Sequence, residues 1–454
     1  MTPAGTFAKL GVFCRISLKY LWRYRRRYLF LFLALGFGFG VVTVISSLKD
    51  GMKENLYLSA QSHYAGDIIA MGYNTGIEVE HHLKSEEAGI IMDAAGAAGL
   101  DPRTAAVRTM VIGRNTSSVY FNGNGVTLKY VVGVDWEREA DYFAKLLHPG
   151  APGEPPGGLG GLNDDSILLS APAARELGAR RGDSVILETL TALGQKNTGV
   201  FIVGDVVEDA SFFAYYKAYV SRVTLNRLIG FADGDCSLIG FFLKDRTKIE
   251  TQREALYREL SGRVPTAPLV YDRGGLEDEV DALDDRAGEP RAVFLITLGV
   301  YLTEVAQLME AIDLASYLLY GMMLVIIMVS AGVTCRLILR ERTRETGTMR
   351  AMGFYESDTR FIFRLEIFVM AFFSLIAGFV LAAGINRLVS FTSFSWFPGF
   401  EVFMRNGSLS ALYLPGTVAV NALAVFLALA LAVWGPIFRD SRTPLPETLS
   451  GGAI

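Results

Sequence analysis

The sequence predicts a membrane protein with four transmembrane α-helices and a large extracytoplasmic α+β domain inserted between the first and second spans. Of its 454 residues 51% are apolar, and its mean hydropathy is +0.32, which is too high for an ordinary soluble enzyme. The apolar residues gather in charge-free runs such as 28–48, whose 21 residues are enough to cross a bilayer. Between the first and second of these runs lies a long hydrophilic region in which strand-like and helix-like patterns alternate.

The chain begins with a basic segment. Residues 1–28 carry seven Lys and Arg side chains and no acid, and apolar and basic residues recur there at helical spacing. Residues 1–27 are therefore predicted to form a cytoplasmic amphipathic helix at the membrane surface, followed by transmembrane helix 1 at 28–48. This run is too long for a cleaved signal peptide, and no small-residue cleavage site follows it. Gly36 and Gly40 either let a second helix approach closely or are merely tolerated in a membrane helix.

Residues 49–292 are predicted to form the extracytoplasmic domain, in one or two lobes. From Lys49 to Asp313 the chain has 25 Lys and Arg against 39 Asp and Glu, a net charge of −14, which excludes a nucleic-acid partner. Strand-like runs occur at 67–71, 128–134, 184–188 and 200–203, and helical patterns occur at 86–98, 171–177 and 248–260. The Pro- and Gly-rich stretch 148–161 is predicted to be a flexible loop or a seam between lobes.

The rest of the chain alternates between apolar runs and short polar segments. Glu304 and Glu310 argue against a membrane span before residue 314, so 293–313 is predicted to be a membrane-proximal helix. The order that follows is transmembrane helix 2 (314–335), a charged cytoplasmic loop (336–361), transmembrane helix 3 (362–386), an outer loop (387–411), transmembrane helix 4 (412–434) and a cytoplasmic tail (435–454). Because the basic residues gather at the two ends and in the charged loop, both termini are predicted to be cytoplasmic.

No catalytic residue, cofactor site or metal site is predicted. The sequence contains no phosphate-binding loop of the type G-x-x-x-x-G-K-[ST]. Adjacent histidines such as His81 and His82 point in different directions, and we expect them in a surface loop. Asp233 and Asp235 lack the further ligands of a calcium loop. Of the three cysteines only Cys236 lies in the hydrophilic region, so no disulfide is expected within it.

The most informative stretch is the charged segment 340–354, which lies between two charge-free apolar runs. Arg340 and Arg344, like Glu341 and Glu345, stand four residues apart and predict two charged rows along one short helix. Gly347 interrupts this pattern, and Gly353 is placed to end the helix. A solvated loop whose arginines only fix the topology would explain the arginines. It would not explain the interleaved glutamates or the small, flat surface formed by Gly347, Thr348 and Ala351.

This segment closely resembles the E-R-T-R-E-I-G-x-x-R-A-x-G signature of FtsX-like (MacB-like) ABC transporter permeases, with Thr346 where the family usually has Ile. The superfamily includes macrolide exporters and lipoprotein-release permeases of the LolC/LolE type. In these proteins the segment is a coupling helix that docks into the ATP-hydrolysing subunit. The resemblance therefore implies an ATPase-coupling role for Glu341, Arg342, Arg344, Glu345, Gly347, Arg350, Ala351 and Gly353. A similar Glu recurs in the family at the position of Glu366, which suggests a structural pair with a coupling-loop arginine rather than a proton relay.

Weaker resemblances extend over the rest of the chain. The runs 131–135 and 173–183 are similar to elements of the family's MacB-like outer domains, and 446–449 is similar to its P-x-E-A-L tail, with Thr448 in place of Ala. From the residues alone, Gly182 and Asp183 are a structural turn that leads into a strand.

The resemblance implies a non-catalytic permease in the bacterial plasma (inner) membrane. Its expected partners are a separate ABC ATPase subunit, a second permease copy or paralogue that forms a dimer, membrane lipid, and lipoproteins as cargo. The outer domain of roughly 240 residues favours the lipoprotein-release branch over the cell-division branch, whose outer domain is usually much smaller. Two alternatives remain open, namely an FtsX-type signalling scaffold that regulates cell-wall hydrolases and a membrane-anchored receptor without an ATPase.

Overall fold

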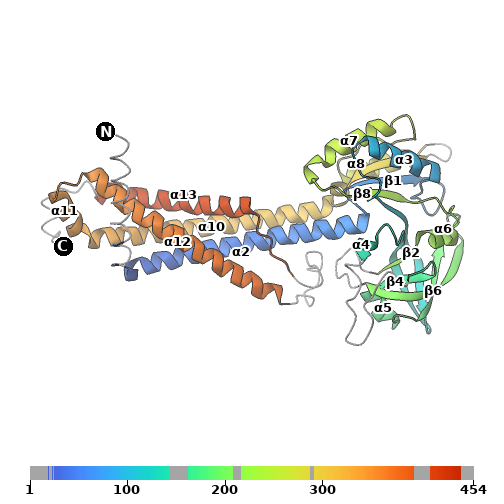
Figure 1. Ribbon diagram of the computed structural model, residues 1–454, viewed down its shortest axis with the longest axis horizontal. Helices are drawn as coiled ribbons and strands as arrows, with labels where there is room; N and C mark the ends of the chain where they lie inside the picture. The colour runs from blue at the N-terminus through green and yellow to red at the C-terminus, as the bar shows by residue number, and fades with distance from the viewer. Residues whose placement is uncertain are drawn as a thin grey trace. The chain divides into compact units, whose positions relative to one another are not determined.

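The computed structural model describes residues 19, 23, 25–143, 162–207, 216–286, 291–392 and 409–440. The described residues fall into two compact units, drawn in Figure 1. The helical unit comprises the described residues up to Glu54, from Met309 to Thr392 and from 409 to 440. The sheet unit runs from Asn55 to Leu308.

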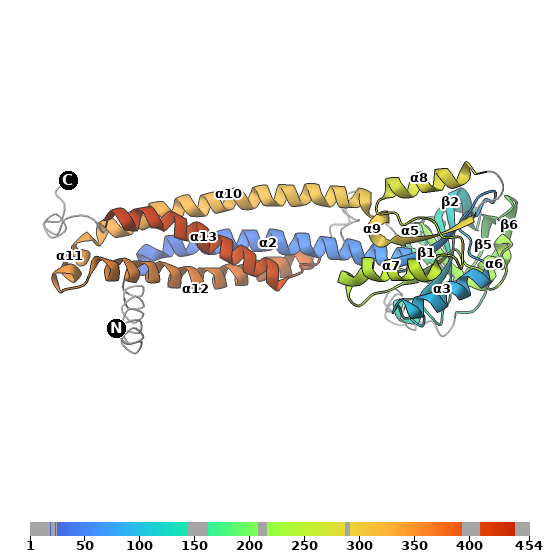
Figure 2. The same cartoon turned by 90° about the horizontal axis from the view of Figure 1, so that it is seen from above.

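Four helices among the described residues are long and apolar enough to cross a membrane. They are α2 (Arg25–Tyr64), α10 (Thr303–Glu341), α12 (Glu356–Ser390) and α13 (Pro415–Asp440), and they run side by side in both Figure 1 and Figure 2. All four contribute to one apolar core, which includes Leu31, Leu35, Phe39, Ile327, Ala331, Phe363, Met370, Val425 and Leu429. Other large apolar side chains of the same helices are exposed, as is typical of surfaces in contact with lipid.

Helix α2 meets α12 at a point where glycines let the two backbones approach. A Cβ atom at Gly36 would lie 3.1 Å from the carbonyl oxygen of Ser374, and one at Gly40 would lie 3.1 Å from that of Gly378. A Cβ atom at Gly378 would lie only 2.3 Å from the carbonyl oxygen of Gly36. Gly36 and Gly40 are therefore sites of close helix packing, the first of the two roles that the sequence left open.

The sheet unit contains a nine-stranded sheet in the order β3-β7-β4-β6-β5-β2-β8-β1-β9, with an additional pairing of β3 with β2. The strands are β1 (Ile68–Asn74), β2 (Ala106–Phe121), β3 (Asn124–Val134), β4 (Ser166–Ser170), β5 (Ser184–Leu190), β6 (Lys196–Val207), β7 (Lys217–Ser221), β8 (Leu238–Phe241) and β9 (Arg291–Thr297). Because β2 pairs with both β3 and β5, six of these strands close into a small barrel. Helices α5 (Ala171–Leu177) and α6 (Arg222–Ile229) add apolar side chains to the barrel core.

The long strand β2 continues from the barrel into a second layer formed with β8, β1 and β9. One face of this layer packs on α3 (Ser85–Ala97) and α7 (Ile249–Leu260), and the other packs near α8 (Arg273–Asp284). Alternate residues of β1 point to opposite faces of the sheet. Ile68 packs in the core on one face, and Ile69 packs in the core on the other. Both faces are covered, which explains why the strand is apolar at nearly every position. The remaining short elements are α4 (Ala140–Phe143), η3 (Arg246–Lys248) and α9 (Leu298–Tyr301).

The C-terminal end of α2 is fixed within the sheet unit. The carboxylate of Asp67, which is fully buried, accepts hydrogen bonds from Tyr57 and from Gln61 Nε2 (2.8 Å), both on the last turns of α2. It also accepts one from the backbone N–H of Leu243 (2.7 Å), directly after β8.

A second set of contacts holds the last carbonyl groups of the helix. Arg108 of β2 is fully buried, and its Nη1 donates to the carbonyl oxygens of Ser62 (2.8 Å) and His63 (3.1 Å). The ring of Tyr64 stacks on that of Tyr301 in α9, with 4.2 Å between centroids. The end of α2 is thus bonded to the sheet and packed against the segment that precedes α10.

The predicted elements of the sheet unit are largely confirmed. The four predicted strands correspond to β1, β3, β5 and β6, and the three predicted helices to α3, α5 and α7. Gly182 has a φ of +89° and lies in the turn that leads into β5, as expected. The stretch 148–161 lies outside the described residues.

One boundary prediction was wrong. A membrane-proximal helix was expected over 293–313, but Arg291–Thr297 is strand β9 and pairs with β1 along its whole length. The run Ala-Val-Phe-Leu-Ile-Thr is rich in β-branched and aromatic residues, and it fills both cores of the layer. Helix therefore begins only at α9, and α10 continues from Thr303 to Glu341 without a break.

Other boundaries differ by less. Helix α2 continues past the expected end at residue 48 to Tyr64, and α13 begins at Pro415 rather than 412. Most of the charged loop expected at 336–361 is helical. It contains the end of α10 up to Glu341, all of α11 (Thr343–Ala351) and the start of α12 from Glu356. Most of the amphipathic segment 1–27, the outer loop from 393 to 408 and the tail beyond 440 lie outside the described residues.

Candidate functional site

The charged segment forms two connected helices rather than one. Helix α10 ends at Glu341, Arg342 forms a turn, and α11 runs from Thr343 to Ala351. The backbone N–H of Arg342 still donates to the carbonyl oxygen of Ile338 (3.2 Å), so the chain bends without losing its hydrogen bonds. The expected charged rows along one helix were therefore wrong, since Glu341 and Glu345 lie on opposite sides of this bend.

Helix α11 ends as the sequence predicted. Gly353 has a φ of +96°, and the N–H of Phe354 donates to the carbonyl oxygen of Met349 (3.2 Å), which is the bond of a glycine-terminated helix. Gly347 does not interrupt the helix as expected. It lies inside α11 and is buried.

Arg342 is buried, with 1% of its surface exposed. Its Nη1 donates to Glu366 Oε2 (2.6 Å), and its Nε donates to Glu345 Oε2 (2.9 Å). The guanidinium also lies over the ring of Phe363, 4.8 Å from the centroid. A buried guanidinium needs such partners, because an unpaired charge in this environment is strongly unfavourable.

Glu366 lies on α12 and is fully buried. The suggested pair with a coupling-loop arginine is present, and the arginine is Arg342. A third partner was not foreseen. The hydroxyl of Tyr28, on the first turn of α2, donates to Glu366 Oε2 (2.7 Å) and lies 3.4 Å from Arg342 Nη1. A tyrosine at the edge of a membrane span is common, so nothing local in the sequence marks it as a partner of Glu366.

The other described residues of the segment differ in exposure. Glu341, Thr348, Ala351 and Gly353 are exposed, and Glu345 is half-buried. The side chains of Arg344, Thr346 and Arg350 lie outside the described residues. The segment therefore offers an exposed surface on α11 and a buried ionic cluster beneath the bend.

A second ionic cluster joins α2 to α10 about 20 residues further along α2. Asp313 of α10 accepts a hydrogen bond from Lys53 Nζ and forms an ion pair with Lys49, whose Nζ lies 3.1 Å from Asp313 Oδ1. The ammonium of Lys49 also lies 5.4 Å from the ring centroid of Tyr317. These contacts link the two helices that contain residues of both units.

Among the described residues, no group of three or more His, Cys, Asp or Glu side chains could hold a metal ion. His82 is bonded to Asp235 (2.8 Å), and Asp233 forms an ion pair with Arg227 (2.9 Å). His81 is only partly exposed, and its desolvation lowers the pKa of its imidazole to about 4. The two histidines lie in a loop as expected, but this loop packs within the sheet unit and leaves both side chains only partly exposed.

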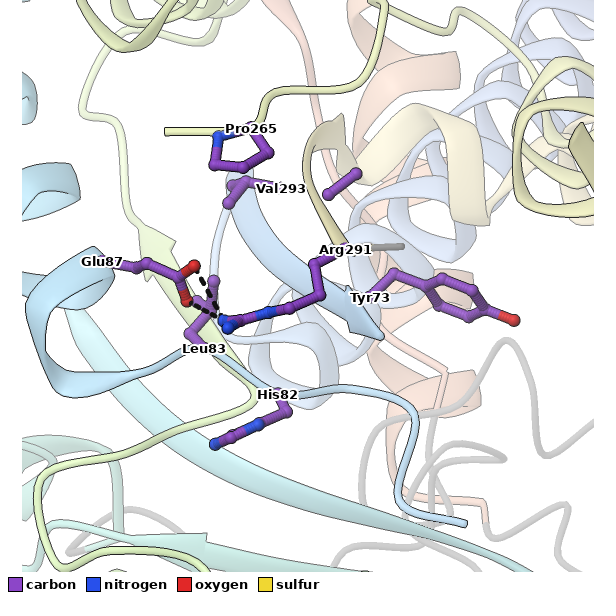
Figure 3. Close-up of a pocket in the computed structure, with 8 residues that line it drawn as sticks. Tyr73, His82, Leu83, Glu87, Pro265, Arg291 and Val293 are labelled. Carbon is purple, nitrogen blue, oxygen red and sulfur yellow. Dashed lines mark hydrogen bonds and ion pairs between the residues drawn. The ribbon is translucent and has the colours of Figure 1, made fainter. Parts of the chain in front are cut away.

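A small hollow in the sheet unit is lined in part by Tyr73, His82, Glu87 and Arg291 (Figure 3). Arg291 Nη2 donates to both carboxylate oxygens of Glu87, at 2.8 and 2.6 Å, and this pair ties β9 to α3. Figure 3 shows the ring of Tyr73 directed away from the pair. The charged groups of the hollow thus satisfy one another, and the pair has a structural role.

Arg342 and Glu366 lie in a part of the chain that matches a known protein family. Residues 317–445 match the family model of the FtsX-like permease C-terminal domain. This part of the chain is an FtsX-like permease domain. The match contains the described parts of α10 from Tyr317 onward, α11, α12 and α13, and so confirms the resemblance that was inferred from the charged segment.

Permeases of the FtsX-like family are membrane subunits that generally carry no catalytic site and generally work with an ABC ATPase. A comparison with curated proteins found no match to this chain. The FtsX-like domain therefore indicates an ABC permease subunit, while the cargo has to be argued from the structure.

Proposed function

We propose that the protein is the permease subunit of an ABC transporter in the bacterial plasma membrane. In this proposal a separate ATPase docks on α11, and its hydrolysis cycle moves the sheet unit, which lies outside the cytoplasm. The moving sheet unit drives the release of lipoproteins or of another apolar cargo from the outer leaflet. The observation that carries the proposal is an FtsX-like domain joined through α2 and α10 to a large sheet unit.

The way in which α2 is held supports mechanical transmission. At its first turn Tyr28 is bonded to Glu366, and at its last turns Tyr57 and Gln61 are bonded to Asp67. A continuous helix that is bonded at both ends can pass a displacement from one end to the other, because its backbone hydrogen bonds resist bending and stretching. The Lys49–Asp313 ion pair ties α10 to the same helix.

The polar groups inside the helical unit support the same conclusion. Asn386 of α12 donates to Ser47 of α2 and to Tyr413, both at 2.7 Å, and Asn421 of α13 donates to Ser46 (3.1 Å). These side chains are bonded to one another and hold the helices together. A hydrophilic cargo would need a water-filled path with polar walls. We therefore favour an apolar cargo that is handled at the outer face.

We infer the orientation of the chain in the membrane from the positions of its basic residues. Seven basic residues lie within the first 27 residues, and α11 lies in a segment rich in arginine, so we place both termini and α11 in the cytoplasm. The proposal includes a second copy or a paralogue of the chain, because four helices alone form a small membrane unit.

Purification and reconstitution test this function. The permease should co-purify with a nucleotide-binding subunit encoded beside it, and the complex in nanodiscs should hydrolyse ATP. With a triacylated fluorescent lipopeptide in the nanodisc and albumin as acceptor, ATP should release the lipopeptide, and a non-hydrolysable analogue should not. Cross-linking the two outer domains of a dimer should abolish release and leave basal hydrolysis largely intact.

The signalling scaffold predicts a different outcome. The complex would hydrolyse ATP without releasing the lipopeptide, and the sheet unit would bind and activate a cell-wall hydrolase. Absence of any co-purifying nucleotide-binding subunit would contradict both functions and favour the receptor.

A further inference from the structure

We infer that Arg342 is a positioning residue of the transport cycle, not a docking contact. Through Tyr28, Glu345 and Glu366 its guanidinium holds α11 at a fixed angle to α2 and α12. A movement imposed on α11 is then passed to α2 instead of being lost at the bend. This inference rests on the proposed function and identifies the residue through which the motion leaves the docking helix.

The first argument is exposure. Arg342 has 1% of its surface exposed, so a protein that docks on the segment cannot bind its side chain. Ala351 is exposed on α11 and can contact such a partner. The segment thus divides into an outer surface that can dock and a buried side chain that acts within the permease.

The second argument is connectivity. Arg342 occupies the bend between α10 and α11, the weakest point of the path because one residue there is not helical. Its guanidinium reaches Glu345 on α11 and Glu366 on α12, and Tyr28 on α2 shares the same carboxylate oxygen. One side chain therefore joins every helix that meets at the bend. A planar group with five donors suits this role, whereas a lysine could not bond in these directions at once.

The third argument is energetic. Glu366 is fully buried and Tyr28 is 3% exposed, so the cluster is largely removed from water. Burying a charged pair contributes little net stability, and an apolar replacement of the same size is often at least as stable. Loss of one partner, in contrast, removes a counter-charge from a buried group and destabilises the arrangement of the helices around it. The cluster thus fixes one arrangement of α11, which is the property a positioning element needs.

Three variants and a matched control test the inference. Glu366→Gln keeps the shape but removes the charge, and Tyr28→Phe removes one hydroxyl. Arg342→Glu combined with Glu366→Arg and Glu345→Gln, called the exchanged pair, exchanges the charges of the pair and removes the carboxylate of Glu345, which would otherwise face a like charge. The control is Arg336→Gln, which removes an exposed arginine of α10 that lies before the bend.

The first readout is hydrogen exchange of the α11 amides in the purified permease alone. Glu366→Gln should lower their protection by roughly 100-fold, as expected when a buried pair loses one partner, and the control should not change it. Tyr28→Phe should lower protection by a smaller factor, and the exchanged pair should restore most of it. Unchanged protection in both Glu366→Gln and Tyr28→Phe would overturn the inference.

The second readout is motion in the complex with the co-purified ATPase. Spin labels at Leu193 in the sheet unit and at Thr392, directly after α12, report an ATP-driven change in distance, with Cys14 replaced by Ser. Glu366→Gln and Tyr28→Phe should keep ATPase binding within about twofold of wild type and diminish the distance change, and the exchanged pair should recover it. Glu341 is exposed, so Glu341→Lys, which reverses a charge on the expected docking surface, should weaken ATPase binding and serves as the reference. Cluster variants that weaken ATPase binding as strongly as this reference would show that the cluster belongs to the docking surface, and the inference would be wrong.

The two proposals fail differently. A wild-type complex without any ATP-driven change would contradict the proposed function, and the exchange experiment on the permease alone would still decide whether Arg342 positions α11. A wild-type change that persists in every variant would leave the proposed function intact and refute the role of Arg342.

Discussion

Replacing Gly378 by alanine should weaken the helical unit, whereas the same replacement at Gly384 should not. Both glycines lie on α12, six residues apart. A Cβ atom at Gly378 would lie 2.3 Å from the carbonyl oxygen of Gly36 and 3.2 Å from the backbone nitrogen of Gly40. A Cβ atom at Gly384 would meet nothing within 4 Å. The second variant is therefore a matched control for the effect of alanine on the helix itself.

The magnitude follows from this geometry. An ordinary contact between non-bonded heavy atoms is about 3.5 Å, so α2 and α12 would have to separate by about 1 Å at their crossing. Both sides of the contact are backbone, which cannot turn away as a side chain can. Overpacking of this kind costs about 1–3 kcal/mol, and we expect the upper part of that range. Alanine gains up to about 1 kcal/mol in helix propensity at either position. The two variants should then differ in free energy of unfolding by about 3 kcal/mol.

Thermal unfolding of the purified protein in nanodiscs measures this difference. For a unit of this size, about 3 kcal/mol corresponds to a lower Tm for Gly378→Ala than for Gly384→Ala by roughly 6–12 °C. Gly36→Ala, whose Cβ would lie 3.1 Å from the carbonyl oxygen of Ser374, should fall between the two. Equal unfolding temperatures for the two α12 variants would refute the close crossing of α2 and α12.

Three further predictions concern topology and the sheet unit. A cysteine introduced at Leu193, whose side chain is 81% exposed, should react with an impermeant thiol reagent in intact cells. A cysteine introduced at Thr348 should react only after lysis, and the reverse labelling would refute the proposed orientation. Burial raises the pKa of the Cys236 thiol to about 12, so at pH 8 it should alkylate at least roughly 100-fold more slowly than a cysteine at Leu193. Because the pKa of His81 falls to about 4 on folding, the unfolded chain binds a proton between pH 6.5 and 4 that the folded chain does not. The free energy of unfolding should therefore fall as the pH is lowered through this range, and His81→Gln should flatten the dependence.

Local patterns were enough to predict much of this protein. The charge-free runs predicted the apolar helices, and the strand-like run Ser184 to Glu188 predicted β5, because Val and Ile favour strands. The glycine at 353 predicted the end of α11, since only a residue without a side chain adopts that backbone conformation readily. These features depend on neighbours within a few residues.

The errors concern contacts between distant residues. Strand β9 was taken for helix because its apolar run continues into α9 and α10, and only its pairing with β1, more than 200 residues earlier, distinguishes the two states. The bend at Arg342 was missed for a related reason. A sequence of charged helix-forming residues predicts one helix, but three partners on other helices hold the arginine at a point where the chain turns. Barrel closure through β2 and β3 is likewise invisible in any single segment.

The same distinction applies to the polar residues of the membrane helices. In sequence, Asn386, Asn421 and Glu366 could each be read as part of a cargo path, since polar side chains in a span are often functional. In the structure each is bonded to α2, through Ser47, Ser46 and Tyr28 respectively. Helix α2 is therefore hydrogen-bonded to both α12 and α13. A helix bonded in this way cannot shift alone, so displacement of the α11 end should move α2 together with its neighbours. This collective attachment of α2 supports the proposed transmission of motion to the sheet unit.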